Sequence, residues 1–279
     1  MNYPDLLRRL DAMLPVYASW LQKLAESVGD ILLANVDLPE GSRVLDVCGG
    51  SGALAVAAAE HGYQVTSVEM SPMTATYLAG RLAPYSGSTG MLVDPQALPY
   101  ETDTFDAAFS VLKLLSLGPI SAGAAREMCR VVRPGGTIAV AHWAVAHASP
   151  VHKVLIDASR DLDDPRISIS ADQVGYVAPD ELAGFFTAAG LAEVRVESHT
   201  LDLVLPAAED FWMEMHPVMA MQPDFASLSA GERARYEEAL IERLRRIQKG
   251  LEPHPQAQFN VARAKVPATT PAHWSAARP

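Results

Sequence analysis

The sequence contains little positive charge, and this shortage excludes whole classes of partner. Lys and Arg together number 22 among 279 residues, against 33 Asp and Glu, so the formal net charge is −11. Such a chain is repelled by phosphate backbones and anionic lipid, and its densest basic stretch, 242–249, lies in a segment of mixed charge. We therefore expect neither nucleic acid nor a membrane among its partners.

Cysteines, clusters of metal ligands and long apolar segments are also scarce. Two cysteines, Cys48 and Cys129, are too few for a disulfide framework or a four-sulfur metal site, which fits a reducing compartment. No His, Cys and Asp residues cluster at ligand spacing, so no metal site is predicted. The N-terminus lacks the apolar region of a signal peptide, and no window of about 18 residues is free of charge, His and Pro. We expect a cytoplasmic protein of undetermined oligomeric state, with a homodimer as one option.

The first half of the chain has the pattern of an α/β protein. Apolar residues at helical spacing predict two helices over 5–36, separated at Pro15. From Arg43 to Trp143, short β-rich runs alternate with helical segments, as in βαβ units around a parallel sheet. The sequence therefore predicts a doubly wound sheet.

The second half is less regular, and we expect it to complete the same domain. A polar stretch over 161–176 is long enough to be either a lid or a connection. The other expected elements are helices over 149–160, 179–190, 207–221 and 229–249, and strands over 192–205 and 256–266.

The most informative segment is an apolar strand that runs into a tight turn of small residues, VLDVCGGSG (44–52). A helix is expected directly after it, and the free N–H groups at a helix start favour an anionic group of a ligand. Glu69 ends the next expected strand, 17 residues after Gly52, where a carboxylate suits a ribose diol. By themselves these features leave both a nicotinamide cofactor and S-adenosylmethionine (SAM) open.

Further motifs distinguish the two cofactors. Over residues 40–145 the chain resembles the class I SAM-dependent methyltransferases, particularly the branch of ubiquinone and menaquinone biosynthesis methyltransferases and related small-molecule enzymes. The resemblance rests on LDVCGGSG, SVEMSP, DPQALPYETDTFDAAFS and CRVVRPGGTIAVAHW, which occur in the family's order. It implies a Rossmann-like sheet of seven strands, with an N-terminal helical lid (1–36), a SAM-binding domain (40–266) that carries a helical cap insertion (about 207–250), and a flexible tail (267–279).

The resemblance also implies which residues hold SAM. The turn and Asp46 would hold the methionyl part, while Glu69 would accept both ribose hydroxyls and Met70 would pack on the adenine. Asp94 would receive the adenine amino group, and Ser110 and Val111 would line the methionine end. The complete implied set is Asp46, Cys48, Gly49, Gly50, Gly52, Glu69, Met70, Asp94, Pro95, Ser110 and Val111.

Three positions depart from the family pattern. Cys48 replaces the first glycine of G-x-G-x-G, and Pro95 lacks the backbone N–H that the family often directs to the adenine ring. Many relatives carry a pair of histidines after the fourth strand, where this chain has Lys113-Leu114-Leu115-Ser116. A general base is therefore not expected at that point.

Methyl transfer needs mainly positioning, and only a weakly acidic acceptor requires a base. His142, at the end of a central strand, is the best candidate for a base, and the alternative is a packed strand-end histidine. His147 and His152 are weaker candidates. The segment 207–221 is either a substrate-facing cap or a helix packed on the sheet. The candidate substrate-binding residues are Tyr17, Lys113, Trp143, Phe211, Trp212 and His216.

The leading interpretation is methyl transfer from SAM to a small, partly apolar metabolite, with S-adenosylhomocysteine as product. Oxygen is the favoured acceptor atom, and nitrogen and carbon stay open. The alternatives are an enzyme that uses SAM for cyclisation or elimination at the sulfonium, a non-catalytic SAM-fold binding protein, and a nicotinamide-dependent dehydrogenase.

Overall fold

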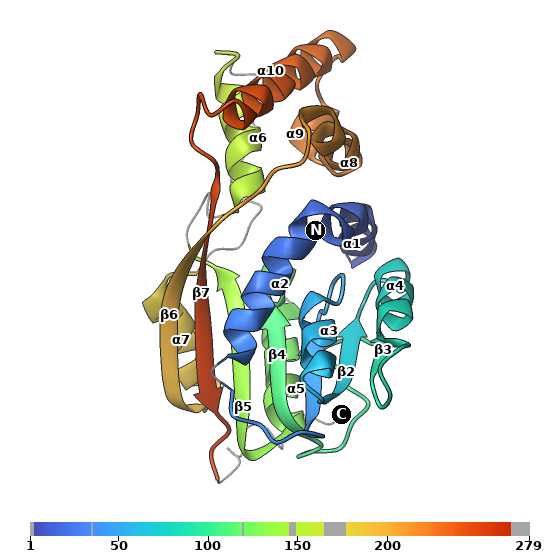
Figure 1. Cartoon of the computed structure of the whole chain (residues 1–279), viewed down its shortest axis with the longest axis vertical. Coiled ribbons are helices and arrows are strands. Elements are labelled where there is room, and N and C mark those ends of the chain that lie inside the picture. Colours follow the sequence, from blue (N-terminus) through green and yellow to red (C-terminus); the bar gives the residue numbers. More distant parts are fainter. Residues whose placement is uncertain (1–2, 35, 119, 145–148, 165–176, 269–279) are drawn as a thin grey trace.

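A seven-stranded sheet forms the centre of the computed structural model (Figure 1). The structure describes residues 3–34, 36–118, 120–144, 149–164 and 177–268. The strand order is β3-β2-β1-β4-β5-β7-β6, and only β7 runs antiparallel to its neighbours. The strands are β1 (Arg43–Val47), β2 (Gln64–Glu69), β3 (Thr89–Leu92), β4 (Phe105–Val111), β5 (Val132–Trp143), β6 (Ala192–Asp202) and β7 (Gln256–Lys265). This topology confirms the predicted doubly wound, seven-stranded α/β fold.

Helices cover both faces of the sheet because its central strands are buried on both sides. One apolar core lies under α2 (Trp20–Leu33), α3 (Ala53–Glu60) and α4 (Pro72–Leu82). The other lies under α5 (Ile120–Val131) and α7 (Pro179–Ala188). The loops that follow β1, β2 and β4 therefore emerge together at one edge of the sheet, where parallel strands end.

The N-terminal helices correct one prediction. The break was expected at Pro15, but α1 (Tyr3–Ala18) continues through this proline and the chain turns at Ser19 instead. Leu14 and Val16 on either side of Pro15 are buried, so packing retains the helix although one N–H is missing. Ser71 at the start of α4 donates a hydrogen bond to Asp11, which ties α1 to the edge of the sheet.

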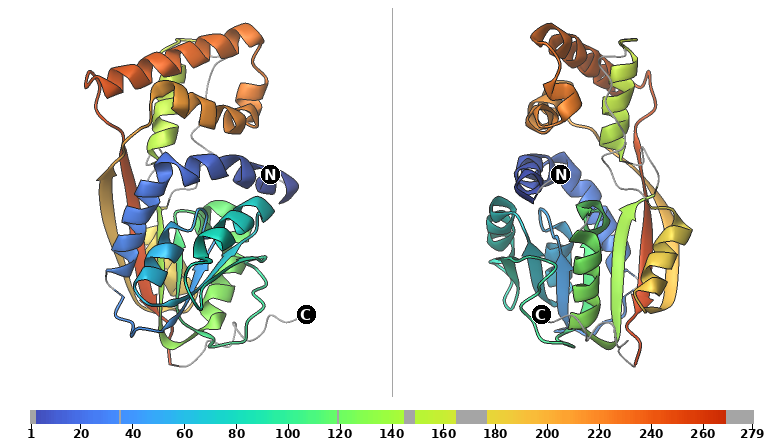
Figure 2. Two further views of the ribbon diagram at one scale, coloured as in Figure 1. Left: turned by 45° about the vertical axis from the view of Figure 1, so that its right-hand side comes forward. Right: turned by 180° about the vertical axis from the view of Figure 1, so that it is seen from behind.

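A second group of helices lies beyond this edge of the sheet (Figures 1 and 2). We call it the helical cap, and it comprises α6 (Pro150–Arg160), α8 (Ala208–Ala220), α9 (Pro223–Ala226) and α10 (Ala230–Gln248). The expected cap covered only 207–250, whereas α6 packs against α10 and the Tyr236 hydroxyl donates to the Leu155 carbonyl across 3.0 Å. The cap therefore combines two segments that are distant in the sequence.

The cap contacts the N-terminal helices directly. The Trp20 and Phe211 rings lie 5.2 Å apart, and the Ser19 hydroxyl donates to the Glu214 carboxylate across 2.6 Å. Between cap and sheet, a short helical turn, η1 (Leu114–Leu117), follows β4. Among the described residues, no helix combines the length and the apolar character needed to cross a membrane.

Candidate functional site

The turn after β1 brings backbone N–H groups close to the end of β2. Gly50 and Gly52 have φ values of 59° and 79°, and Cys48 adopts a φ of 59° that non-glycine residues rarely have. A Cβ atom at Gly49 would collide with Ser67 and Asp46, so this position requires glycine. The family pattern has glycine at this position, which suits a left-handed backbone conformation. This chain keeps the same conformation with a cysteine. Burial raises the pKa of the Cys48 thiol, which therefore stays protonated and unreactive.

Asp46 is a buried carboxyl group directly beneath this turn. Its Oδ2 accepts a hydrogen bond from the Ser67 hydroxyl at 2.7 Å, whereas its buried Oδ1 has no hydrogen-bond partner among the described residues. Burial raises the pKa of Asp46 to about 7, and the nearby negative charge of Glu69 acts in the same direction. The group therefore lies at the midpoint of its titration near neutral pH.

Glu69 and Lys113 form an ion pair at the end of β2. Lys113 Nζ lies 2.6 Å from Glu69 Oε1, and the two side chains are 9% and 0% exposed. The Gly50 N–H donates to the same oxygen at 2.7 Å, and the Met70 N–H donates to Oε2 at 3.1 Å. Burial alone would lower the pKa of Lys113, but the Glu69 carboxylate more than offsets this and raises it. Lys113 therefore carries its charge beside the turn.

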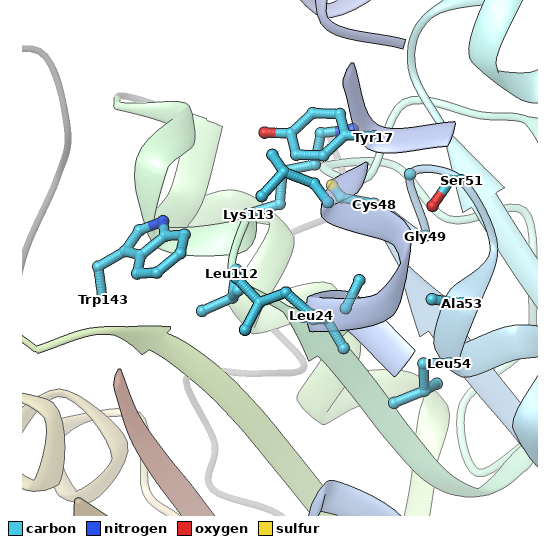
Figure 3. A pocket seen from close by; sticks show the side chains of 14 residues that line it. Tyr17, Leu24, Cys48, Gly49, Ser51, Ala53, Leu54, Leu112, Lys113 and Trp143 are labelled. Atoms are coloured by element: carbon cyan, nitrogen blue, oxygen red, sulfur yellow. The ribbon is translucent and has the colours of Figure 1, made fainter. Parts of the chain in front are cut away.

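A cavity opens between this turn, α2 and the segment after β4 (Figure 3). Cys48, Gly49 and Gly50 line one wall, and Leu24 and Leu54 line another. Figure 3 shows the Tyr17 ring beside Lys113, whose Nζ lies 5.6 Å from the ring centroid. This first cavity therefore contains the glycine-rich turn and the lysine of the ion pair.

A second cavity of about 170 Å³, open to solvent on one side, lies between α1, the cap and η1. Its walls are mostly apolar and include Leu10, Met215 and Met219, together with Arg9 and His152. Five residues line both cavities, which are therefore adjoining spaces. They are Tyr17, Leu21, Leu112, Lys113 and Trp143.

Of the expected cofactor residues, Cys48, Gly49, Gly50 and Val111 line the first cavity. The Ser110 hydroxyl donates to the Val47 carbonyl at 2.7 Å, which joins β4 to the turn. Met70 is buried directly after Glu69. Asp94 is exposed, and its carboxylate accepts the Gln96 N–H at 2.9 Å beyond the end of β3. Pro95 is buried at the same turn.

The candidate substrate residues divide into two groups. Tyr17, Lys113 and Trp143 line both cavities, as described above. Phe211 and Trp212 line neither cavity: Phe211 packs against Trp20 of α2, and Trp212 packs on Phe225 and Tyr236 within the cap. His216 is exposed on the outer side of the same helix, against Trp212. On α8 the cavity wall is formed by Met215, Val218 and Met219 instead.

The histidine candidates differ in whether they border a cavity. His142 is 0% exposed and lines neither cavity, because alternation along β5 directs it to the opposite face from Trp143. His152 on α6 lines the second cavity, and its Nδ1 lies 3.1 Å from the Ser149 hydroxyl. His147 lies outside the described residues. The geometry thus favours His152 over His142 as a group that can reach an acceptor.

Arg9 is a cavity residue that the sequence did not single out. It shares a face of α1 with Leu6, Leu10, Met13 and Tyr17, which all line the second cavity. Helical spacing alone indicates that these side chains point the same way. It does not indicate what that face meets, so the sequence carried no signal that this face borders a cavity.

The first cavity and the two carboxyl groups beside its glycine-rich wall fit a nucleoside cofactor that carries an amino acid group. Glu69 is a buried carboxylate at the end of β2, the position at which doubly wound folds place an acceptor for ribose hydroxyls. The buried and unpartnered Asp46 Oδ1, close beneath the turn, offers an acceptor for a polar group. Gly49 and Gly50 line the cavity without side chains, so ligand atoms can approach the backbone there.

Known proteins share sequence with this chain. Residues 45–140 match the family described as the methyltransferase domain. An uncharacterised protein of Mycobacterium tuberculosis is 32% identical over 186 residues, which cover 64% of this chain and 67% of that protein. The 2-methyl-6-phytyl-1,4-hydroquinone methyltransferase of Synechocystis sp. is 35% identical over 107 residues, or 38% of this chain and 33% of that enzyme.

The fold comparison points the same way. The structure of Haemonchus contortus phosphoethanolamine N-methyltransferase 2 in complex with SAM superposes with a TM-score of 0.54 at 18% identity. The match covers 86% of this chain and 52% of that one, and it shows that the fold is shared. With the methyltransferase domain and its relatives, these findings show that the chain belongs to the class I SAM-dependent methyltransferases and uses SAM as its cofactor.

Proposed function

We propose that the protein transfers the methyl group of SAM to a small, partly apolar metabolite, at oxygen in preference to nitrogen or carbon. The product from SAM is then S-adenosylhomocysteine. The observation that carries this proposal is the second cavity, which adjoins the first through five shared residues. Concave, mostly apolar cavities with a few polar groups are typical of small-molecule sites.

We assign the cofactor to the first cavity and its rim. Bound SAM supplies an electrophilic methyl carbon on a sulfonium, and this chain's residues hold and orient it. Glu69 would accept the ribose hydroxyls, the turn at Gly49 and Gly50 would lie against the methionyl part, and Asp46 would accept a polar group beneath it. Met70 and the segment at Asp94 would border the adenine.

The acceptor would lie in the second cavity, between α1 and the cap. Leu10, Met215 and Met219 provide apolar walls, and Trp143 borders the path between the two cavities. These walls exclude water from the reacting atoms, which favours displacement by the acceptor over reaction with water. We propose on this basis that α1, α2 and the cap together enclose the acceptor.

A hydroxyl acceptor must lose its proton before or during the transfer. We propose His152 as the group that takes it, because its ring borders the second cavity while His142 is enclosed in the sheet. An acceptor that is already an anion needs no base.

Mass spectrometry of reactions with SAM and a panel of hydroxyl, carboxyl and amine acceptors tests the proposal. An acceptor that gains 14 Da together with S-adenosylhomocysteine supports it. Methylthioadenosine without a methylated acceptor would instead select cyclisation or elimination at the sulfonium. Binding of SAM with no turnover across the panel would contradict the proposed reaction.

A further inference from the structure

The buried ion pair between Lys113 and Glu69 occupies a position that the cofactor also needs. A carboxylate oxygen offers two lone pairs to donors. On Glu69 Oε1 both are taken, one by the Gly50 N–H at 2.7 Å and one by Lys113 Nζ at 2.6 Å. A ribose hydroxyl can reach this oxygen only when Lys113 leaves it.

The Lys113 side chain has space next to it into which its ammonium group can move. Its side chain lines both cavities, and it lies at the junction between them beside the Tyr17 ring. A lysine has a flexible four-carbon stem, so its ammonium can exchange one partner for another by rotation alone. Because Lys113 lines both cavities, rotation of its side chain away from Glu69 brings the ammonium group toward the second cavity.

The second cavity makes an anion the favoured new partner. Its walls are largely apolar, and a desolvated ammonium there is costly without a counter-charge. Asp224, the acidic residue of this lining, is exposed. The inner wall is therefore suited to an apolar molecule with an acidic oxygen.

We propose that Lys113 is an exchangeable latch: it pairs with Glu69 in the free protein, and cofactor binding releases it to bind the carboxylate or phenolate oxygen of an apolar acceptor. This proposal rests on the proposed function and specifies its substrate class. The acceptor is then an organic acid or acidic phenol, and cofactor binds before acceptor. Because Lys113 stabilises the oxyanion, such an acceptor presents a lone pair to the methyl carbon without a separate base.

Calorimetry with S-adenosylhomocysteine tests the latch without any knowledge of the acceptor. In Lys113→Met the cofactor no longer competes with an ammonium for Glu69, so its Kd should fall by about tenfold, while the Tm of the free protein should also fall. Lys153→Met is the matched control, because this exposed lysine pairs with Asp157 on the outer face of α6. Its Kd should equal that of the wild type. An unchanged Kd in Lys113→Met, or a weaker one, overturns the latch.

Two ligand series test the acceptor class. Straight-chain carboxylates of increasing length and their matched primary amides are titrated into protein saturated with S-adenosylhomocysteine. The best-fitting acid should bind at least about tenfold more tightly than its amide, and Lys113→Met should remove this preference. Equal binding at every length, or binding of neither series, overturns the anionic acceptor. Methylation of neutral acceptors by Lys113→Met at the wild-type rate would reject the latch yet keep the proposed methyl transfer.

Discussion

Cofactor binding should depend on pH through Asp46. The carboxyl group is buried beneath the glycine-rich turn, and its pKa is raised to about 7. SAM carries a cationic sulfonium and an ammonium group, and both favour the ionised carboxylate over the neutral acid. Binding should therefore release a proton from the fraction of molecules in which Asp46 is still protonated, and it should weaken as pH falls.

The size of the effect follows from the pKa. If only the ionised form binds and its pKa is about 7, the apparent Kd should be about tenfold higher at pH 6 than at pH 8. Isothermal titration calorimetry at intervals across this range measures the slope. Repeating the titrations in buffers with different ionisation enthalpies counts the protons released.

Asp46→Asn separates this effect from the titration of the ligand itself. SAM carries titratable groups of its own, so the ligand contributes the same pH dependence to both proteins. Only the wild type should show the additional slope, and Asp106→Asn, which alters a carboxyl group paired with Arg133 on the surface, should match the wild type. Equal slopes in wild type and Asp46→Asn would refute the reasoning.

The same raised pKa has a consequence for stability. Because the folded-state pKa of Asp46 lies above the ordinary value of 3.8, protonation of this group favours the folded protein. The stability that it contributes is complete below pH 4 and is lost as pH rises through 7. Urea unfolding without ligand should show this loss in the wild type relative to Asp46→Asn.

Three further predictions concern the cofactor, the base and the cap. Glu69→Gln should weaken SAM binding by about 1–3 kcal/mol in calorimetry, because charge-assisted bonds to the ribose are lost, and unchanged affinity would mean that the nucleotide lies elsewhere. His142→Ala should lower the Tm but keep kcat within a few-fold, whereas His152→Ala should lower the kcat of a neutral alcohol acceptor, which has to lose a proton, by about 100-fold. Met215→Ala should lower the free energy of unfolding in urea by about 2–5 kcal/mol and raise the KM of the acceptor, since this buried side chain also forms part of the cavity wall.

The central fold was predictable because its signals are local. Short apolar runs separated by helical segments specify a parallel sheet, and the strand FDAAFSV was expected and found over 105–111. Reliance on local signals also explains the error at Pro15, because a proline inside a helix normally ends or bends it. Only the packing of Leu14 and Val16 shows that this helix continues, and packing is not visible in a spacing pattern.

The cofactor side of the site was likewise more accessible to prediction than the acceptor side. The turn at 48–52 and the carboxylate of Glu69 are close in the sequence to the strands that position them. By contrast, α8 is rich in Met and aromatic residues, and nothing in that composition tells Met215, which lines the second cavity, from Phe211, which packs against Trp20. The partner of Lys113 is 44 residues away, so the ion pair depends on strand order, which the sequence implies only through the family.

These two sides divide the work of the enzyme between different parts of the chain. The sheet and its first turns hold the groups that we assign to SAM, whereas the second cavity, which we propose for the acceptor, is lined by α1, α6 and α8. The Ser19 hydroxyl donates a hydrogen bond to Glu214 and so joins the N-terminal helices to the cap. The helices that line the second cavity from these two parts of the chain are therefore in direct contact. Lys113 is the charged group common to both cavities. Cofactor occupancy and acceptor choice are therefore expected to be coupled through this one side chain, and substitutions in the helices should alter which acid is methylated without altering how SAM is held.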